Sequence, residues 1–340
     1  GDKAGKLLAW LGNKERESRW VESIRGEDGE LHTTEEQIVS VFARYYTKLY
    51  GTDPSKGPQQ IRQYLENIRL PQITVEERAN LEKEITLEEV QAAIAGMKTG
   101  KCPGPNGIPA EVYKKYSETL SPHLLNLFLG ARDEGSLPLD LRKATIVVIH
   151  KPGKPRDECG AYRPISLLNV ETKILAAILA TRLTGVILNL IHQDQSGFMP
   201  GRSTRLNLRR VHNWLAEIEN RQIPHLLLSL DAEKAFDVVN WSFMHQVLEI
   251  FGFGPKFRQW VELLYHNPVA TVRVNGYSSS EFPIEKGRWQ GCPLSPLLFA
   301  LTLEPLACRV RDQTEISGFQ VANEPEYQEK ISLYADDILL

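Results

Sequence analysis

Cysteine is scarce in this chain of 340 residues, which has only four. No two cysteines have the C-x-x-C spacing, and no histidine stands at zinc-ligand spacing beside them. The pattern therefore offers no zinc site, and we expect buried or inert free thiols in a reducing compartment. The four are Cys102, Cys159, Cys292 and Cys308.

Long hydrophobic runs and a strong net charge are also missing. The most apolar stretch, residues 174–191, is interrupted by Arg182 and by several polar residues. It predicts an amphipathic or core helix and not a membrane span, and no secretory signal is visible. The formal net charge is only −3, so the distribution of charge matters more than its sum. Lys and Arg outnumber Asp and Glu between residues 141 and 222.

The most informative residues are three aspartates that follow apolar runs. Asp336 and Asp337 come after residues 331–334, and Asp231 ends the run 225–231. Adjacent carboxylates repel each other unless something positive lies between them, and Mg²⁺ prefers oxygen ligands. Two such ions promote in-line displacement at phosphorus, so the first hypothesis is a nucleotidyl transferase. The alternative for each aspartate taken alone is a turn residue or a helix N-cap.

Further segments around these aspartates resemble one family in order. Three resemble the motifs of reverse transcriptases: DAEKAFD at 231–237 is similar to motif A, KGRWQGCPLSPLLF at 286–299 to motif B, and YADD at 334–337 to motif C. Upstream, YRPISLLN and QSGFMPGR resemble blocks of the polymerase fingers, and KTGKCPGPNGI resembles the extra N-terminal block of non-LTR elements. The similarity extends from about Leu87 to Leu340. It is nearest to LINE-type (non-LTR) retrotransposon enzymes, and group II intron proteins are the nearest relatives to exclude.

This resemblance implies an α+β polymerase right-hand fold with fingers and a ferredoxin-like palm. We expect a helical N-terminal extension at residues 1–85, fingers at 86–222 and a palm at 223–340 that is truncated after motif C. No residues match the thumb, the endonuclease or the cysteine-rich tail of the family. We therefore expect residues 1–340 alone to have little or no processive activity.

Local patterns predict individual elements. Apolar spacing predicts a helix over 35–49, and Thr86 with Glu89 has the form of a capping box. Asn275-Gly276 signals a hairpin with a connection longer than two residues. Other helices are expected over 170–188, 203–220, 241–250 and 295–309, and a further helix is expected to start at Pro255. Strands are expected over 144–149, 225–231, 269–274, 281–285 and 331–334.

The resemblance also assigns metal ligands. It implies that Asp231 and Asp336 bridge two Mg²⁺ ions, for which Mn²⁺ is a substitute. The backbone carbonyl of Ala232 would complete one coordination shell. Asp337 is grouped with the catalytic residues, where it tunes its neighbour or contacts the primer end.

Nucleotide-binding residues follow in the same way. Arg163 and Lys154 are candidates for the triphosphate, and Gln290 and Gly291 for the lining of the nucleotide pocket. Phe236 stands at the family's aromatic steric gate against a ribose 2′-hydroxyl, with a core phenylalanine as the alternative. One departure is Trp289, which stands where many relatives have arginine.

A row of arginines precedes motif A. Arg202, Arg205 and Arg209 recur at spacings of three and four and so share one helix face. Such a row can follow a phosphate backbone, whereas the alternative is a solvated helix surface.

The implied partners are an RNA template, a DNA primer and a deoxynucleoside triphosphate, with no membrane. The sequence carries no signal of oligomeric state, and an intracellular ribonucleoprotein in cytoplasm and nucleus is expected. The hypothesis is an RNA-directed DNA polymerase that copies its element transcript from a nicked genomic primer. The alternatives are a catalytically silent fragment and a maturase-like RNA-binding protein on the same fold.

Overall fold

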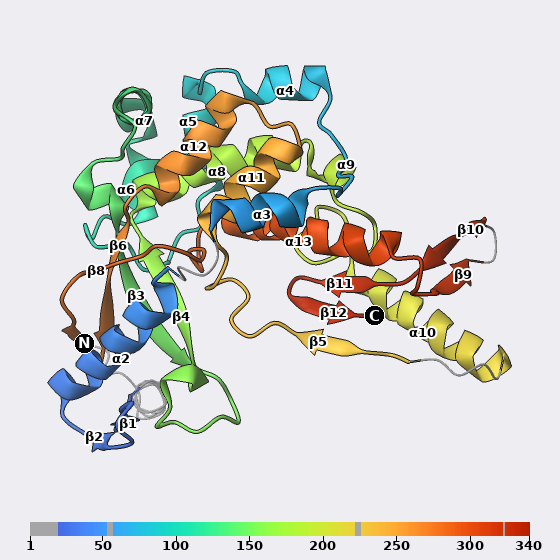
Figure 1. The fold of residues 1–340 in the computed structure, drawn as a ribbon. Helices are drawn as coiled ribbons and strands as arrows, with labels where there is room; N and C mark the ends of the chain where they lie inside the picture. The colour runs from blue at the N-terminus through green and yellow to red at the C-terminus, as the bar shows by residue number, and fades with distance from the viewer. Residues whose placement is uncertain (1–19, 53–56, 222–225, 322–323) are drawn as a thin grey trace, which may run out of the picture.

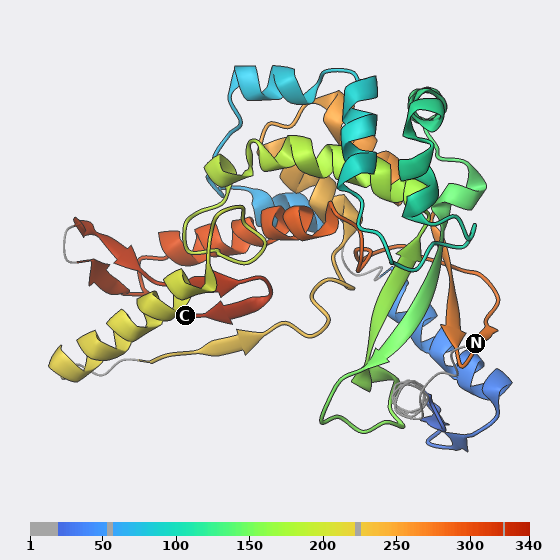
Figure 2. The same ribbon diagram turned by 180° about the vertical axis from the view of Figure 1, so that it is seen from behind.

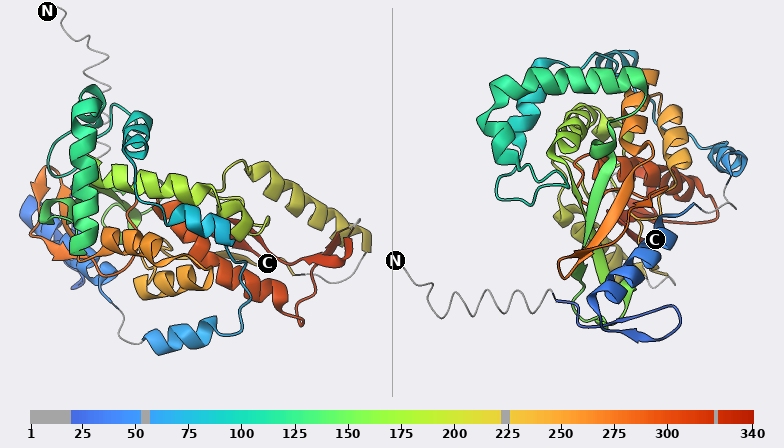
Figure 3. Two further views of the ribbon diagram at one scale, coloured as in Figure 1. Left: turned by 90° about the horizontal axis from the view of Figure 1, so that it is seen from above. Right: turned by 90° about the vertical axis from the view of Figure 1, so that its left-hand side faces the viewer.

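The computed structural model describes residues 20–52, 57–221, 226–321 and 324–340. The beginning of the expected N-terminal extension and His225, at the start of an expected strand, lie outside these residues. The two largest β-sheets are separate from each other, and Figure 1 shows them below a layer of helices. The left panel of Figure 3 places helix α10 (Thr204–Arg221) at the opposite end of the molecule from helix α7 (Ser117–Glu134).

The N-terminal region contains a hairpin as well as the expected helices. Strands β1 (Ile24–Arg25) and β2 (Leu31–His32) pair antiparallel. Helix α2 (Glu35–Tyr50) confirms the predicted amphipathic helix, because Ile38 and Phe42 on its apolar stripe are buried. Two shorter helices follow, α3 (Pro58–Leu65) and α4 (Val75–Leu81).

The helical layer begins with the predicted capping box. The Thr86 hydroxyl accepts a hydrogen bond from the Glu89 amide, and the Glu89 carboxylate accepts one from the Thr86 amide. The single helix expected over 170–188 is wrong, because the helix ends at Thr184 and a second short helix follows. The remaining helices of the layer are α5 (Leu87–Gly96), α6 (Ala110–Lys115), α7, α8 (Val170–Thr184), α9 (Ile187–Leu190), α11 (Trp241–Ile250), α12 (Pro255–Tyr265) and α13 (Ser295–Asp312).

The larger sheet has the order β4-β3-β6-β7, with β8 also paired to β6. Strand β3 is antiparallel to β4 and parallel to β6. The turn Asn275-Gly276 joins β6 to β7 with two residues only, so the expected longer connection is wrong. Both turn residues have positive φ, 52° and 91°, as a type I′ hairpin requires. The strands are β3 (Lys143–His150), β4 (Tyr162–Leu168), β6 (Val269–Val274), β7 (Tyr277–Ser278) and β8 (Phe282–Pro283).

The smaller sheet has the order β11-β12-β5. Its core is a small apolar cluster with α13, in which Ala307 meets Ile331, Leu333 and Ile338. The hairpin β9–β10 lies beyond it, and Trp214 of α10 stacks on Phe319 of β9. The strands are β5 (Ser229–Asp231), β11 (Ser332–Tyr334), β12 (Asp337–Leu339), β9 (Phe319–Val321) and β10 (Glu324–Glu329).

The strands of the expected palm do not form one ferredoxin-like sheet. Strand β6 pairs with β3, which was expected in the fingers, and β5 pairs with β12 in the other sheet. A ferredoxin-like plan needs these strands side by side. The expectation failed because local apolar patterns specify strands without specifying their partners. Figure 2 shows the chain leaving β5 and crossing from the smaller sheet to the helical layer.

The helices share one trait that bears on membranes. Among the helices of the described ranges, none has both the length and the apolar character needed to span a bilayer.

Candidate active site

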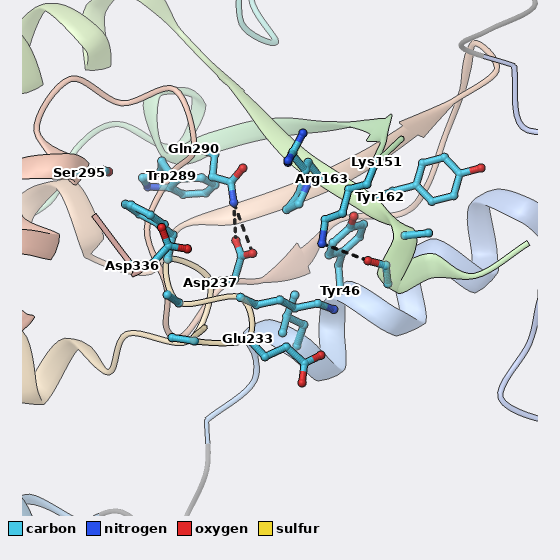
Figure 4. A pocket seen from close by; sticks show the side chains of 18 of the residues that line it. Tyr46, Lys151, Tyr162, Arg163, Glu233, Asp237, Trp289, Gln290, Ser295 and Asp336 are labelled. Carbon is cyan, nitrogen blue, oxygen red and sulfur yellow. Dashed lines mark hydrogen bonds between the residues drawn. The ribbon is translucent and has the colours of Figure 1, made fainter. Parts of the chain in front are cut away.

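A cleft of about 880 Å³ opens where the two sheets and helix α2 approach one another. Its walls come from Tyr46 of α2, from the β3–β4 connection, from the turn after β5 and from the loop before α13. Figure 4 shows the side chains of Lys151, Arg163, Asp237 and Gln290 gathered around it.

The three predicted aspartates lie on neighbouring strands. Asp231 ends β5 and pairs directly with Asp337, the first residue of β12. Asp336 stands in the two-residue turn between Tyr334 and Asp337. Asp231 and Asp336 line the cleft together with Ala232, whereas Asp337 is not part of its lining.

The electrostatics of these aspartates show their proximity. Burial and then the negative charges of Asp336 and Asp231 raise the pKa of Asp337 above its ordinary value. Within the ranges that the structure describes, no three His, Cys, Asp or Glu side chains are close enough together to hold a metal ion. The structure thus concentrates negative charge where β5 and β12 pair. Carboxylate oxygens are the ligands that Mg²⁺ prefers, and a bound cation would offset the repulsion between these carboxylates.

Basic residues line the opposite wall of the cleft. Arg163 projects from β4, and Lys154 lies in the turn between β3 and β4. The Lys154 carbonyl is held by the His150 ring at 3.0 Å. Lys151 also lines the cleft, although sequence reasoning assigned it no role. In the sequence, the one feature that pointed to Lys151 was its position in the same basic turn as Lys154.

Phe236 lines the cleft and also packs on the helical layer. Its ring stacks on Phe299 of α13 with a centroid distance of 4.2 Å. The Phe198 ring is nearly perpendicular to the Phe236 ring, and their centroids are 5.7 Å apart. The structure shows that Phe236 packs on Phe299 and lines the cleft, and its role as a steric gate stays a prediction.

The residues of motif B close the cleft on a third side. The Gln290 carbonyl accepts a hydrogen bond from the Ser166 amide at 3.0 Å. Gly291 has φ 121°, and a Cβ atom there would lie 3.1 Å from the Ser166 carbonyl, so the backbones approach closely. Trp289 is buried at 7% exposure and lines the same wall.

Asp237 is a functional candidate that sequence reasoning missed. It is 2% exposed, accepts a hydrogen bond from the Tyr50 hydroxyl at 3.0 Å, and faces the Gln290 amide at 3.4 Å (Figure 4). Burial raises its pKa to about 6, opposed by the hydrogen bond from Tyr50 and by Lys234. Asp237 closes the motif A segment, but nothing local in the sequence indicates its burial.

The three arginines of the predicted row do not share one environment in the structure. Arg202 precedes helix α10, and its guanidinium donates to the carbonyls of Ile191, His192 and Gln195 at 2.5–2.7 Å. The expectation of three arginines on one helix face is therefore wrong for Arg202, because backbone carbonyls occupy its donors. Arg205 and Arg209 lie on α10 and are exposed.

Comparison with known proteins gives consistent matches. The family described as "Reverse transcriptase (RNA-dependent DNA polymerase)" matches residues 149–340. The chain is 30% identical over 339 residues to the transposon TX1 uncharacterized 149 kDa protein of Xenopus laevis, covering 100% of this chain and 25% of that protein. It is 29% identical to the Pol polyprotein of the type-2 retrotransposable element R2DM of Drosophila melanogaster, covering 86% of this chain and 27% of that protein.

A third relative carries an enzyme name. The chain is 29% identical to the RNA-directed DNA polymerase from mobile element jockey of Drosophila melanogaster, covering 85% of this chain and 30% of that protein. The chain thus spans between a quarter and a third of the length of these relatives.

Proposed function

Because the chain belongs to the reverse transcriptase (RNA-dependent DNA polymerase) family, in its non-LTR retrotransposon branch, we propose that its cleft is the polymerase active site. The proposed reaction joins the α-phosphate of a deoxynucleoside triphosphate to the 3′-hydroxyl of a DNA primer on an RNA template. The proposed architecture is the right-hand polymerase plan, with the two sheets on either side of the cleft.

The observation that carries the proposal is the pairing of Asp231 with Asp337 beside Asp336. The pairing brings Asp231 and Asp336, which are more than 100 positions apart in sequence, to the same side of the cleft, with Asp337 behind them. Like charges rarely gather at an edge without a cation to neutralise them. In an enzyme that copies nucleic acid, divalent cations bound at such a site would promote nucleotidyl transfer.

Two Mg²⁺ ions, when bound, would activate the primer hydroxyl and neutralise the leaving pyrophosphate. Asp231 and Asp336 are the proposed ligands, helped by the Ala232 carbonyl. Asp337 does not line the cleft, so its proposed role is to add negative potential behind Asp336. Mn²⁺ has similar ligand preferences and is the proposed substitute.

The nucleotide is proposed to lie between the basic wall and motif B. Arg163 has a fixed charge and a forked geometry that matches phosphate oxygens, and Lys154 adds a second positive charge. Gln290 and Gly291 form the floor of the pocket. The exposed face of Phe236 limits the space beside the sugar, while its other face rests on Phe299.

Single-nucleotide incorporation tests the proposal directly. A 5′-labelled DNA primer on an RNA template is incubated with one dNTP and either Mg²⁺, Mn²⁺ or EDTA. The expected result is extension by one nucleotide that depends on the metal and on the matching dNTP. Binding of the RNA without metal-dependent extension would contradict the proposal and support a maturase-like role.

A further inference from the structure

The turn that carries Asp336 contains a strained residue. Ala335 has φ 56°, in the left-handed region that residues with a Cβ atom adopt only at a cost. It is followed by Asp336, and the flanking residues Tyr334 and Asp337 are paired as the last rungs of the hairpin. The direction in which Asp336 points therefore depends on holding Ala335 in an unfavourable conformation.

One buried amide side chain holds both backbone groups of Ala335. The Gln195 Nε2 group donates to the Ala335 carbonyl at 3.2 Å, and the Gln195 Oε1 atom accepts from the Ala335 amide at 3.1 Å. The same Oε1 atom accepts from the Gly197 amide at 2.8 Å. Gln195 is 1% exposed, so these bonds are protected from competing water.

The loop around Gln195 approaches the hairpin more closely than side chains allow. A Cβ atom on Gly197 would lie 2.1 Å from the Ala335 backbone nitrogen. Along the same edge, the Ser196 amide donates to the Leu333 carbonyl at 3.0 Å, and the Leu333 amide donates to the Asp194 carbonyl at 2.9 Å. The loop thus forms an extra parallel bridge beside β11.

The loop is itself fixed from two sides. Arg202 donates to the Gln195 carbonyl at 2.7 Å, and buried Asp194 pairs with Arg311 of α13 at 2.6 Å. A rigid support of this kind can hold the rotamer of Gln195 and so the conformation of the turn.

We propose that Gln195 is a positioning residue, whose amide holds Ala335 left-handed and thereby aims Asp336 into the cleft. The inference rests on the proposed polymerase function for its kinetic consequence, but the hydrogen bonds concern the hairpin alone. Gln195 lies outside the cleft lining, so it acts through Asp336 and not on the nucleotide.

The test compares Gln195→Ala with the double variant Gln195→Ala/Ala335→Gly. Glycine adopts the left-handed conformation without a steric cost, so it should replace the support that the amide supplies. Gln193→Ala is the matched control, because Gln193 is an exposed glutamine two positions away. Gln195→Glu is a second variant of nearly equal size, which keeps the acceptor for the Ala335 amide but replaces the donor to the Ala335 carbonyl with a buried carboxylate oxygen.

Two readouts are measured on each variant: hydrogen–deuterium exchange of the peptide covering 331–337, and kcat and KM for single-nucleotide incorporation. For Gln195→Ala we expect faster exchange and a kcat lower by roughly tenfold to a hundredfold, since a shift on the order of 1 Å at a reacting group has this effect. KM for the dNTP should change little. Gln195→Glu should also give faster exchange and a lower kcat, because its carboxylate faces the Ala335 carbonyl oxygen, and Gln193→Ala should match the unaltered chain.

The double variant distinguishes a role of Gln195 in positioning Asp336 from a general contribution of Gln195 to the folded structure. Recovery of most of the lost kcat by Ala335→Gly supports positioning, whereas a loss that glycine does not recover overturns it. Unchanged exchange and unchanged kcat in Gln195→Ala also overturn it. If the unaltered chain incorporates no nucleotide, the polymerase proposal fails, and the exchange data alone still decide whether Gln195 holds the turn.

Discussion

The Tyr50 hydroxyl donates a hydrogen bond of 3.0 Å to the buried carboxyl group of Asp237, 187 positions later in the chain. Asp237 in turn faces the Gln290 side-chain amide. Helix α2, which precedes every recognisable polymerase motif, is therefore joined through one carboxyl group to motifs A and B. This helix is part of the cleft wall and not a separate attachment.

Replacing Tyr50 with phenylalanine should destabilise the fold. The change leaves the buried Asp237 with one donor fewer, which costs about 1–3 kcal/mol of unfolding free energy. Urea denaturation at neutral pH measures the loss. Tyr46→Phe is the matched control, one turn away on the same helix. The Tyr46 hydroxyl is buried and has no hydrogen-bond partner among the described residues, so its removal should be neutral or stabilising. Equal losses in both variants would contradict this account.

Asp237→Asn should stabilise the protein above pH 6. Burial raises the pKa of Asp237 from 3.8 to about 6, so the folded chain keeps its proton where the unfolded chain has already lost it. Stability therefore falls as pH rises between these values and stays lower above them. The side chain faces Tyr50, Lys234, Lys151 and Gln290.

The asparagine variant removes this loss, which is about 3 kcal/mol at pH 7.5. Urea denaturation at pH 4 and at pH 7.5 measures it, with the exposed Asp312→Asn as the control. A variant that is less stable than the unaltered chain at both pH values would show that the carboxylate is needed in its charged form.

Asp231→Asn or Asp336→Asn should lower single-nucleotide incorporation by roughly a thousandfold, because the proposed metal stabilisation is worth several kcal/mol. RNA binding should be retained, measured by filter binding in EDTA. Glu233→Gln is the matched control, since Glu233 is an exposed carboxylate in the same cleft. An asparagine variant with near-normal incorporation would refute the ligand assignment.

Phe236→Ala should raise the use of ribonucleotides relative to deoxynucleotides on the order of tenfold to a hundredfold. The physical reason is the space beside the sugar that the ring now occupies. The ratio of kcat/KM for matched ribo- and deoxynucleotides measures it. Phe198→Ala removes the edge contact with Phe236 but lies outside the cleft lining, so discrimination should not change. Discrimination that is unaltered in Phe236→Ala would leave packing on Phe299 as its only role.

Replacing both Arg205 and Arg209 with alanine should weaken RNA binding for every sequence. If each contacts one phosphate, the slope of log affinity against log salt should fall by about one unit per contact. Titrations at several salt concentrations measure the slope. Arg62→Ala on α3 is the control, an exposed arginine on a different helix. A constant slope would mean that the pair faces only solvent.

Motifs in one sequence predicted the family well, and the match of residues 149–340 confirms the resemblance. Helix α11 and strand β6 have the predicted bounds because each is specified by a local apolar pattern. The separation of β6 and β5 into different sheets was missed, since the pairing of β6 with β3 joins segments more than 100 positions apart. Gln195 and Asp237 were missed as functional residues for the same reason. Their partners, Ala335 and Tyr50, are distant in sequence.

The pairing of β5 with β12 also limits when the cleft can assemble. Asp231 has no partner strand until Asp337 has been synthesised, because among the described residues β5 pairs only with β12. On a ribosome, the helical layer and the β3–β4 hairpin can form while β5 is still an unpaired strand. Unpaired strand edges can associate with other chains during folding. Pairing between strands that are distant in sequence is also slow. The carboxylate edge should therefore be the last part of the cleft to mature during folding.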